Sequence, residues 1–247
     1  MKDYAIDINC DVGEGVGNES DLFPLISSCN IACGAHAGND DSIVECLKLA
    51  KKHEVLVGAH PSYPDRKHFG RISMDISDAD LTDALQEQLK NFISICKSEQ
   101  VPLHHIKPHG ALYNDIAKNV DKAALFLDAI SSFRQDVFLY VPYDSIVHRL
   151  AISKGFQVKR EAFADRNYTN ELNLVSRKEE NALITNADAV LHHILSMVKD
   201  NLVHTIGGKT VPIFADTFCL HGDTPSAFQI LTYITLQFPK HHIYTIK

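Results

Sequence analysis

Four histidines in this sequence each stand beside a glycine or two residues from one, at places where a short apolar run ends. They occur in the stretches CGAHAG, VGAH, KPHG and CLHG, and they are His36, His60, His109 and His221. One histidine at the end of a strand is commonly a packing or capping residue. The same arrangement repeated at four strand ends predicts a shared chemical role instead, and the glycines suit turns where backbone must approach a ligand closely.

Charged residues accompany these histidines at the predicted strand ends. The carboxylates are Asp11, Glu14, Asp165 and Asp223, and the cations are Lys107, Arg166 and Arg71. Carboxylates and imidazoles activate water by general base catalysis, while lysine and arginine stabilise an oxyanion or hold a substrate carboxylate. This set of residues predicts hydrolytic attack on a carbonyl group.

Asp11, His36 and His60 also form a candidate site for a divalent metal. Imidazole and carboxylate ligands suit such ions, and a coordination position left open would activate water. The sequence lacks a short-range ligand motif such as H-E-x-x-H. The metal therefore stays an alternative to activation of water by the protein alone.

Short β-like runs alternate with helical patterns along the chain. The pattern predicts strands at residues 4–9, 30–35, 54–59, 103–108, 137–142, 156–164 and 211–220. It predicts helices at 40–53, 77–99, 119–133, 144–154, 186–200 and 224–238, with a weak last strand at 241–246. This alternation indicates one α/β domain over residues 1–247, with a parallel sheet closed or nearly closed into a barrel whose strand ends face one mouth. Residues 165–181 fit neither period, which is typical of a functional lid or an insertion.

Composition and missing motifs exclude several other classes of protein. The net charge of -7 is spread without a basic block, so we expect no nucleic-acid or membrane-surface partner. No apolar segment is long enough for a signal peptide or a membrane span, and we expect a cytoplasmic protein with six reduced cysteines. The G-x-S-x-G elbow, the G-x-G-x-x-G fingerprint and a complete phosphate-binding loop are absent, so ATP is not expected to bind through a P-loop.

A set of longer motifs resembles the LamB/YcsF family across almost the whole chain. In order they are DINCDVGE (7–14), NIACGAHAG (30–38), VGAHPSYPD (57–65), FGR (69–71), KPHGALYN (107–114), EAFADRNY (161–168) and HGDTPSA (221–227). The resemblance implies a TIM-like (β/α)7 barrel, related to the glycoside hydrolase and deacetylase barrels. It also implies opening of the lactam of 5-oxo-L-proline to L-glutamate, coupled to hydrolysis of ATP to ADP and phosphate. ATP would then be a cosubstrate of a complex with 5-oxoprolinase subunits B and C.

Combined with the resemblance, the residues suggest a division of roles. The expected catalytic residues are Asp11, His36, His60, Lys107, His109, Asp165 and His221. The expected substrate-binding residues are Asn9, Glu14, Arg71, Tyr113, Arg166 and Asp223. In this scheme Asp11 and the first three histidines deprotonate water, and Lys107 or Arg166 stabilises the oxyanion or holds the substrate carboxylate.

Two loops depart from the family pattern. Residues 68–72 read HFGRI, with one glycine and one arginine fewer than the family tends to have, and residues 172–177 read LNLVSR where the family usually has glycine followed by Leu-Val-Pro-Arg. Both departures fall on loops near the predicted mouth, so they bear on the expected substrate preference or on the order of these loops. The alternatives are a metal-dependent deacetylase acting on an N-acetylated carbohydrate and a non-catalytic binding protein within a larger assembly.

Overall fold

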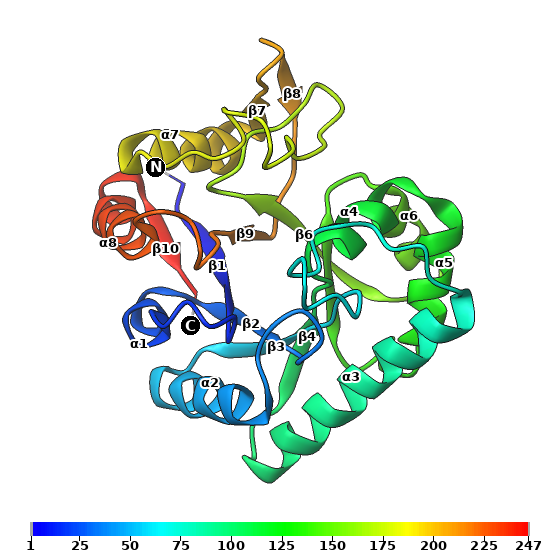
Figure 1. Cartoon of the computed structure of the whole chain (residues 1–247). Helices are drawn as coiled ribbons and strands as arrows, with labels where there is room; N and C mark the ends of the chain where they lie inside the picture. The colour runs from blue at the N-terminus through cyan, green and yellow to red at the C-terminus, as the bar shows by residue number, and fades with distance from the viewer. Residues whose placement is uncertain (1, 247) are drawn as a thin grey trace.

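Seven parallel strands close into a barrel in the computed structural model, which describes residues 2–246 (Figure 1). The two end positions of the expected 1–247 domain lie outside the described residues. Around the barrel the strands are β1 (Tyr4–Val12), β2 (Ser28–Ala32), β3 (Leu56–His60), β4 (Leu103–Ile106), β5 (Phe138–Pro142), β6 (Gln157–Phe163) and β9 (Thr217–Cys219), and β9 pairs back with β1. The predicted TIM-like (β/α)7 barrel is therefore confirmed.

Helices surround the barrel, as Figure 1 shows in a view along its axis. The longer ones are α2 (Asp40–His53), α3 (Asp78–Ser98), α4 (Gly110–Lys118), α5 (Val120–Ala129), α6 (Ile146–Ser153), α7 (Ala187–Leu195) and α8 (Ala227–Gln237). Helix α2 illustrates why they form: Asn39 and Ser42 make a reciprocal capping box, and the buried residues Ile43, Leu47 and Ala50 recur at helical spacing on the face toward the barrel. A short helix α1 (Glu19–Leu22) follows β1.

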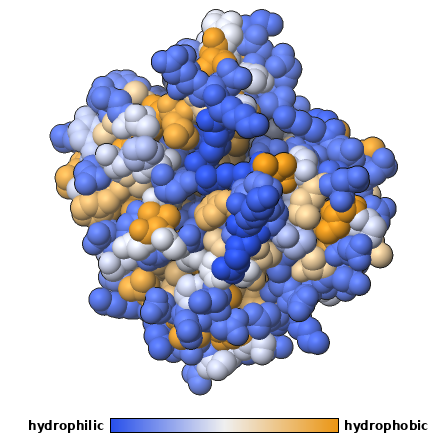
Figure 2. All heavy atoms as spheres, in the orientation of Figure 1, coloured by the Kyte–Doolittle hydropathy of each residue, from blue (hydrophilic) through white to orange (hydrophobic). Residues whose placement is uncertain are grey.

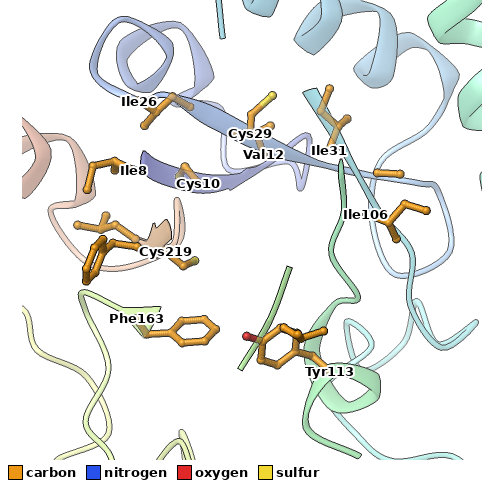
Figure 3. Packing of buried hydrophobic residues seen from close by; sticks show 14 of the residues in the cluster. Ile8, Cys10, Val12, Ile26, Cys29, Ile31, Ile106, Tyr113, Phe163 and Cys219 are labelled. Atoms are coloured by element: carbon orange, nitrogen blue, oxygen red, sulfur yellow. The ribbon is translucent and has the colours of Figure 1, made fainter. Parts of the chain in front are cut away.

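Strand β1 shows how the barrel comes to have a polar interior. The alternation in DINCDV sends Ile8, Cys10 and Val12 into the hydrophobic core, part of which Figure 3 shows. The intervening Asp7, Asn9 and Asp11 are also buried, but they form hydrogen bonds with residues of the other strands. Many barrels of this kind fill their interior with branched apolar side chains. Here polar groups occupy it, and they lead up to the mouth.

The last third of the chain differs most from the sequence-based expectation. The expected strand 211–220 is divided into β8 (Thr210–Pro212), which pairs with β7 (Leu202–His204) in a separate antiparallel hairpin, and β9 of the barrel. The break lies at Asp216, whose backbone and carboxylate bind Arg160 of β6. The expected helix 186–200 is divided into the α-helix α7, which ends at Leu195, and a π-helical turn at Ser196–Asp200.

Two further elements were missed or only weakly indicated. Helix α4 starts directly after the KPH motif, because Ala111, Leu112 and Ile116 give it a buried face. The weak strand becomes β10 (Ile243–Thr245), which pairs with the start of β1 outside the barrel. Residues 165–181 form the expected irregular loop, which carries only isolated bridges such as Tyr168 to Leu174.

The surface is mixed in polarity. Figure 2 shows hydrophilic residues across the centre of the face seen along the barrel axis, with smaller apolar patches around them. No helix among residues 2–246 is both long and apolar enough to cross a membrane. All six cysteines are buried and free.

Candidate active site

The residues expected to act together meet at the carboxyl ends of the barrel strands. Asp11 and His60 lie at the ends of β1 and β3, Lys107 and His109 follow β4, and His221 follows β9. These five residues line a cavity of about 490 Å³ at the mouth. Its other lining residues include Arg71, Tyr113 and Arg166 of the expected substrate-binding set.

Hydrogen bonds to backbone carbonyls orient two of the histidines. His60 Nδ1 lies 2.7 Å from the Lys107 carbonyl oxygen, and His109 Nε2 lies 2.9 Å from that of Phe69. A carbonyl oxygen can only accept, so both of these ring nitrogens carry the hydrogen. In neutral rings His60 Nε2 and His109 Nδ1 are left unprotonated, and they face each other at 2.9 Å.

Two carboxylates point at this pair of ring nitrogens. Asp11 Oδ2 lies 3.5 Å from His60 Nε2, and Glu14 Oε1 lies 3.3 Å from His109 Nδ1. Burial lowers the pKa of His109 well below its usual value, while burial and the charge of Asp11 raise the pKa of Glu14. One carboxylate oxygen each of Asp11 and Glu14 and one unprotonated ring nitrogen each of His60 and His109 thus point toward one another. Because such atoms repel each other, a shared proton or a cation must lie between them.

The donor set of this cluster fits a divalent metal ion. One ligand atom each from Asp11, Glu14, His60 and His109 lies within 4.8 Å of the others. Mixed imidazole and carboxylate ligands suit such an ion, and the outward N–H groups bonded to carbonyls are the usual support for metal-binding histidines. The expected trio named His36 in place of Glu14 and His109.

His36 does not belong to this set of four ligand residues and contacts it through Glu14. Its Nε2 lies 3.2 Å from Glu14 Oε1, its Nδ1 lies 2.9 Å from Ser62 Oγ, and its ring stacks on His109 with centroids 3.8 Å apart. Burial lowers the pKa of His36 to about 2, so the ring is neutral at neutral pH. The close stacking depends on Gly70, since a Cβ there would lie 3.0 Å from His36 Cβ.

Lys107 is a buried cation whose hydrogen bonds are all made inside the protein. Its Nζ lies 2.9 Å from Glu161 Oε1, 3.0 Å from Asp11 Oδ1 and 3.1 Å from Cys219 Sγ. Burial alone would lower its pKa, but the charges of Asp11 and Glu161 raise it well above the usual value. Conversely, burial would raise the pKa of Asp11, and the neighbouring His60 and Lys107 bring it well below its usual value. The pair stays ionised.

A second buried network lies beneath this pair and was not expected from the sequence. His105 Nε2 is 2.7 Å from Asn30 Oδ1, and the Asn30 amide donates to Asn9 Oδ1 and Asp11 Oδ1, both at 2.8 Å. The His105 ring packs directly against Gly58, so a Cβ added to Gly58 would lie 2.1 Å from His105 Nε2. Asn9 belongs to this network and also donates to Glu161, so it supports the site from below.

Asp165 and His221 form a dyad beside Asp11. Both carboxylate oxygens of Asp165 lie 3.0 Å from His221 Nδ1, and Thr224 donates to the same carboxylate. Burial would raise the pKa of Asp165, but His221 and Thr224 outweigh it and bring the pKa to about 2. His221 Nε2 is then directed toward Asp11 Oδ2, 4.0 Å away.

The arginines at the mouth mainly organise loops. Arg166 is buried and donates to the carbonyls of Val175 and Ala182, so it holds the 165–181 loop. Arg71 and Arg177 both bind the carboxylate of Asp223 at the rim of the mouth. Arg177 was noted only as part of a departing loop, and its pairing with Asp223 has no local signal in the sequence.

Glu161 is the other functional group that sequence reasoning missed. It is fully buried in β6 and binds Lys107 and Asn9 through Oε1. The available signal was an acid between Arg160 and two apolar residues near the end of a strand, inside the EAFADRNY motif.

Comparisons with known proteins agree with this architecture. The sequence model of the LamB/YcsF family matches residues 6–246. A protein named as the A subunit of 5-oxoprolinase, from Staphylococcus aureus (strain bovine RF122 / ET3-1), is 42% identical over 234 residues, which is 93% of this chain and 94% of the relative. Its counterpart from strain MRSA252 is 41% identical with the same coverage. The crystal structure of a lactam utilization protein from Thermus thermophilus matches with a TM-score of 0.90 and 32% identity over 98% of each chain.

Proposed function

The chain belongs to the LamB/YcsF family, and from this premise we propose that it hydrolyses the lactam of 5-oxo-L-proline to L-glutamate as the A subunit of an ATP-dependent 5-oxoprolinase. The names of the relatives support the cyclic amide as substrate. The observation that carries the proposal is the cluster of Asp11, Glu14, His60 and His109, of which Asp11 and the two histidines line the mouth cavity. Such a convergence of lone pairs is suited to binding and deprotonating one water molecule.

The proposed reaction adds this water to the lactam carbonyl. The cluster takes one proton from the water, the water oxygen bonds to the carbonyl carbon, and the ring C–N bond breaks. The ring nitrogen takes a proton as it leaves, so one water is consumed and one amine and one carboxylate are produced. Lys107 keeps Asp11 ionised for the first of these steps.

We assign the ATP-dependent step to partner subunits B and C. The sequence lacks a complete phosphate-binding loop, which supports hydrolysis of ATP to ADP and phosphate, with a second water, elsewhere in the complex. The six free, buried cysteines support a reducing compartment, and we place the reaction in the cytoplasm.

A divalent metal would be held by Asp11, Glu14, His60 and His109. When bound, it would supply Lewis-acid chemistry at the substrate carbonyl or the attacking water. The same donor set favours one second candidate, a metal-dependent deacetylase of an N-acetylated carbohydrate. That activity would need neither ATP nor partner subunits.

Reconstitution tests the proposal. The chain is assembled with subunits B and C, and glutamate release from 5-oxoproline is followed with and without ATP and with and without a chelator. His60→Ala should lower the rate on the order of a hundredfold or more. His192→Ala, an exposed histidine of α7, serves as the matched control and should keep full activity.

Three results would contradict the proposal. They are full activity of His60→Ala, deacetylation by the chain alone, and substrate binding without turnover in every assembly. The last result would identify a non-catalytic binding protein. Loss of activity with the chelator and its return with one metal would identify the cation between the histidines.

A further inference from the structure

A second, smaller cavity adjoins the mouth cavity on the side of α4, β5 and β6. It has a volume of about 220 Å³ and is covered by residues 171–174 of the long loop. The two cavities share a wall made by Tyr113 and Phe163, whose rings meet edge to face with centroids 5.6 Å apart. Figure 3 shows the Tyr113 ring with its oxygen directed toward Phe163.

Two buried polar atoms near this wall have no hydrogen-bond partner within residues 2–246. They are the Tyr113 hydroxyl and Glu161 Oε2, on side chains that are only 4% and 1% exposed. A buried polar atom without a partner is costly, and it commonly marks a place where a ligand or water binds. Both residues line the smaller cavity, and Tyr113 lines the larger one as well.

The two atoms have opposite hydrogen-bonding roles. Burial, followed by the charge and the close approach of the Glu161 side chain, raises the pKa of Tyr113 well above its usual value, so the hydroxyl keeps its proton and can donate. Glu161 Oε1 is already bound by Lys107 and Asn9, which leaves Oε2 as a free acceptor. The wall between the cavities thus offers one donor and one acceptor.

A cyclic amide has the edge that complements such a pair. In a five-membered lactam the ring forces the amide to be cis, so its N–H and C=O point to the same side. Open-chain secondary amides are trans by several kcal/mol, and their N–H and C=O point to opposite sides. A donor and an acceptor placed together therefore distinguish a lactam from a linear peptide bond.

We propose that Tyr113 and Glu161 recognise the amide edge of the lactam, with Glu161 Oε2 accepting from the ring N–H and the Tyr113 hydroxyl donating to the carbonyl oxygen. This inference rests on the proposed function, and it assigns the oxyanion donor of that reaction. Lys107 and Arg166, the candidates expected from the sequence, are occupied by internal partners. The Tyr113 hydroxyl has no such partner, and Tyr113 lines the same cavity as Asp11, His60 and His109 of the water-activating cluster.

Tyr113→Phe is the direct test. The change removes an oxygen that has no partner in the protein, so the melting temperature should stay the same or rise slightly. With subunits B and C and ATP, kcat for 5-oxoproline should fall about a hundredfold, as expected for loss of one oxyanion donor. Tyr143→Phe, on the smaller cavity, is the matched control and should retain the wild-type rate.

Glu161→Gln tests the other half of the pair. In wild-type protein, methylation of the lactam nitrogen should weaken binding on the order of tenfold to a hundredfold, because a hydrogen bond to a charged acceptor is lost. This penalty, measured by calorimetry on 5-oxoproline and its N-methyl analogue, should shrink in Glu161→Gln. A merely structural role of Glu161 would weaken both ligands equally.

The outcomes separate this inference from the proposed function. If Tyr113→Phe keeps kcat within threefold of an active wild type, or if the N-methyl penalty is unchanged in Glu161→Gln, the recognition pair is wrong and the proposed function stands. If the wild-type assembly neither binds nor turns over 5-oxoproline, the proposed function fails, and the inference fails with it.

Discussion

Replacing Lys107 by methionine should remove a large part of the free energy of unfolding at neutral pH. Methionine fits the buried stem, but it leaves Asp11 and Glu161 without the cation that lies 3.0 and 2.9 Å from them. Removing one partner of a buried ion pair costs about 3–5 kcal/mol, and two carboxylates are stranded here, so we expect about 5 kcal/mol. A whole domain is commonly stable by only about 5–15 kcal/mol.

Urea denaturation followed by circular dichroism would measure this loss at about pH 7 and about pH 5. The pKa of Asp11 lies well below its ordinary value of 3.8 in the wild type, so its stabilisation is fully present at both pH values and is lost only at lower pH. In Lys107→Met the Asp11 carboxyl is stranded, and protonation at lower pH relieves it. The difference between the two proteins should therefore narrow at about pH 5.

Two further variants make the reasoning refutable. Lys90→Met removes an exposed lysine from the middle of α3 and should change the free energy of unfolding by less than about 0.5 kcal/mol. Adding Glu161→Gln to Lys107→Met removes one stranded charge and should restore part of the stability. A loss below about 1 kcal/mol for Lys107→Met, or one that is equal at both pH values, would show that the cluster is not held by this cation.

Three other predictions follow from the same geometry. Gly58→Ala should lower the free energy of unfolding by about 1–3 kcal/mol, and with it the melting temperature, because the new Cβ would lie 2.1 Å from His105 Nε2. The double variant Gly58→Ala/His105→Ala should lose less stability than the sum of the two single variants. Asp165→Asn should lower the free energy of unfolding by about 2 kcal/mol above pH 3.8, because the folded pKa of Asp165 is about 2. The wild type loses this stabilisation between pH 3.8 and pH 2, so its free energy of unfolding should fall more steeply with acid than that of the variant. Arg177→Ala should speed limited proteolysis within residues 165–181 a few-fold while changing the melting temperature by less than about 2 °C. An unchanged cleavage rate would exclude a role of the ion pair between Arg177 and Asp223 in ordering that loop.

The fold and the meeting of these side chains at one mouth were predictable, because parallel strands bring their carboxyl ends together. The histidine and glycine pattern marked the ends of β2, β3, β4 and β9 without any long-range information. Exact partners were not predictable. His36, His60 and His109 have similar local contexts, and only the backbone carbonyls of Lys107 and Phe69 decide which ring nitrogens face the cluster.

Groups inside the barrel were harder to find than groups at its mouth. Glu161 and His105 lie within strands whose local pattern also fits residues that face solvent. Their burial becomes evident only when Lys107, which follows β4, is placed opposite Glu161 and Asn30 of β2 is placed opposite His105. Likewise, Arg166 was expected to meet the substrate, but the loop carbonyls that it satisfies cannot be located from the sequence.

Closure of the barrel through β9 has a consequence for the order of folding. Asn9 donates to Glu161 and to Thr217, which follow it by 152 and 208 residues. Contacts of such long sequence separation form late, because the chain must first lose the entropy of closing large loops. During synthesis β1 emerges first, yet its polar interior face lacks these partners until β6 and β9 are available. We expect the mouth of the barrel to be among the last parts to assemble, so the proposed activity should return on refolding only with the final kinetic phase.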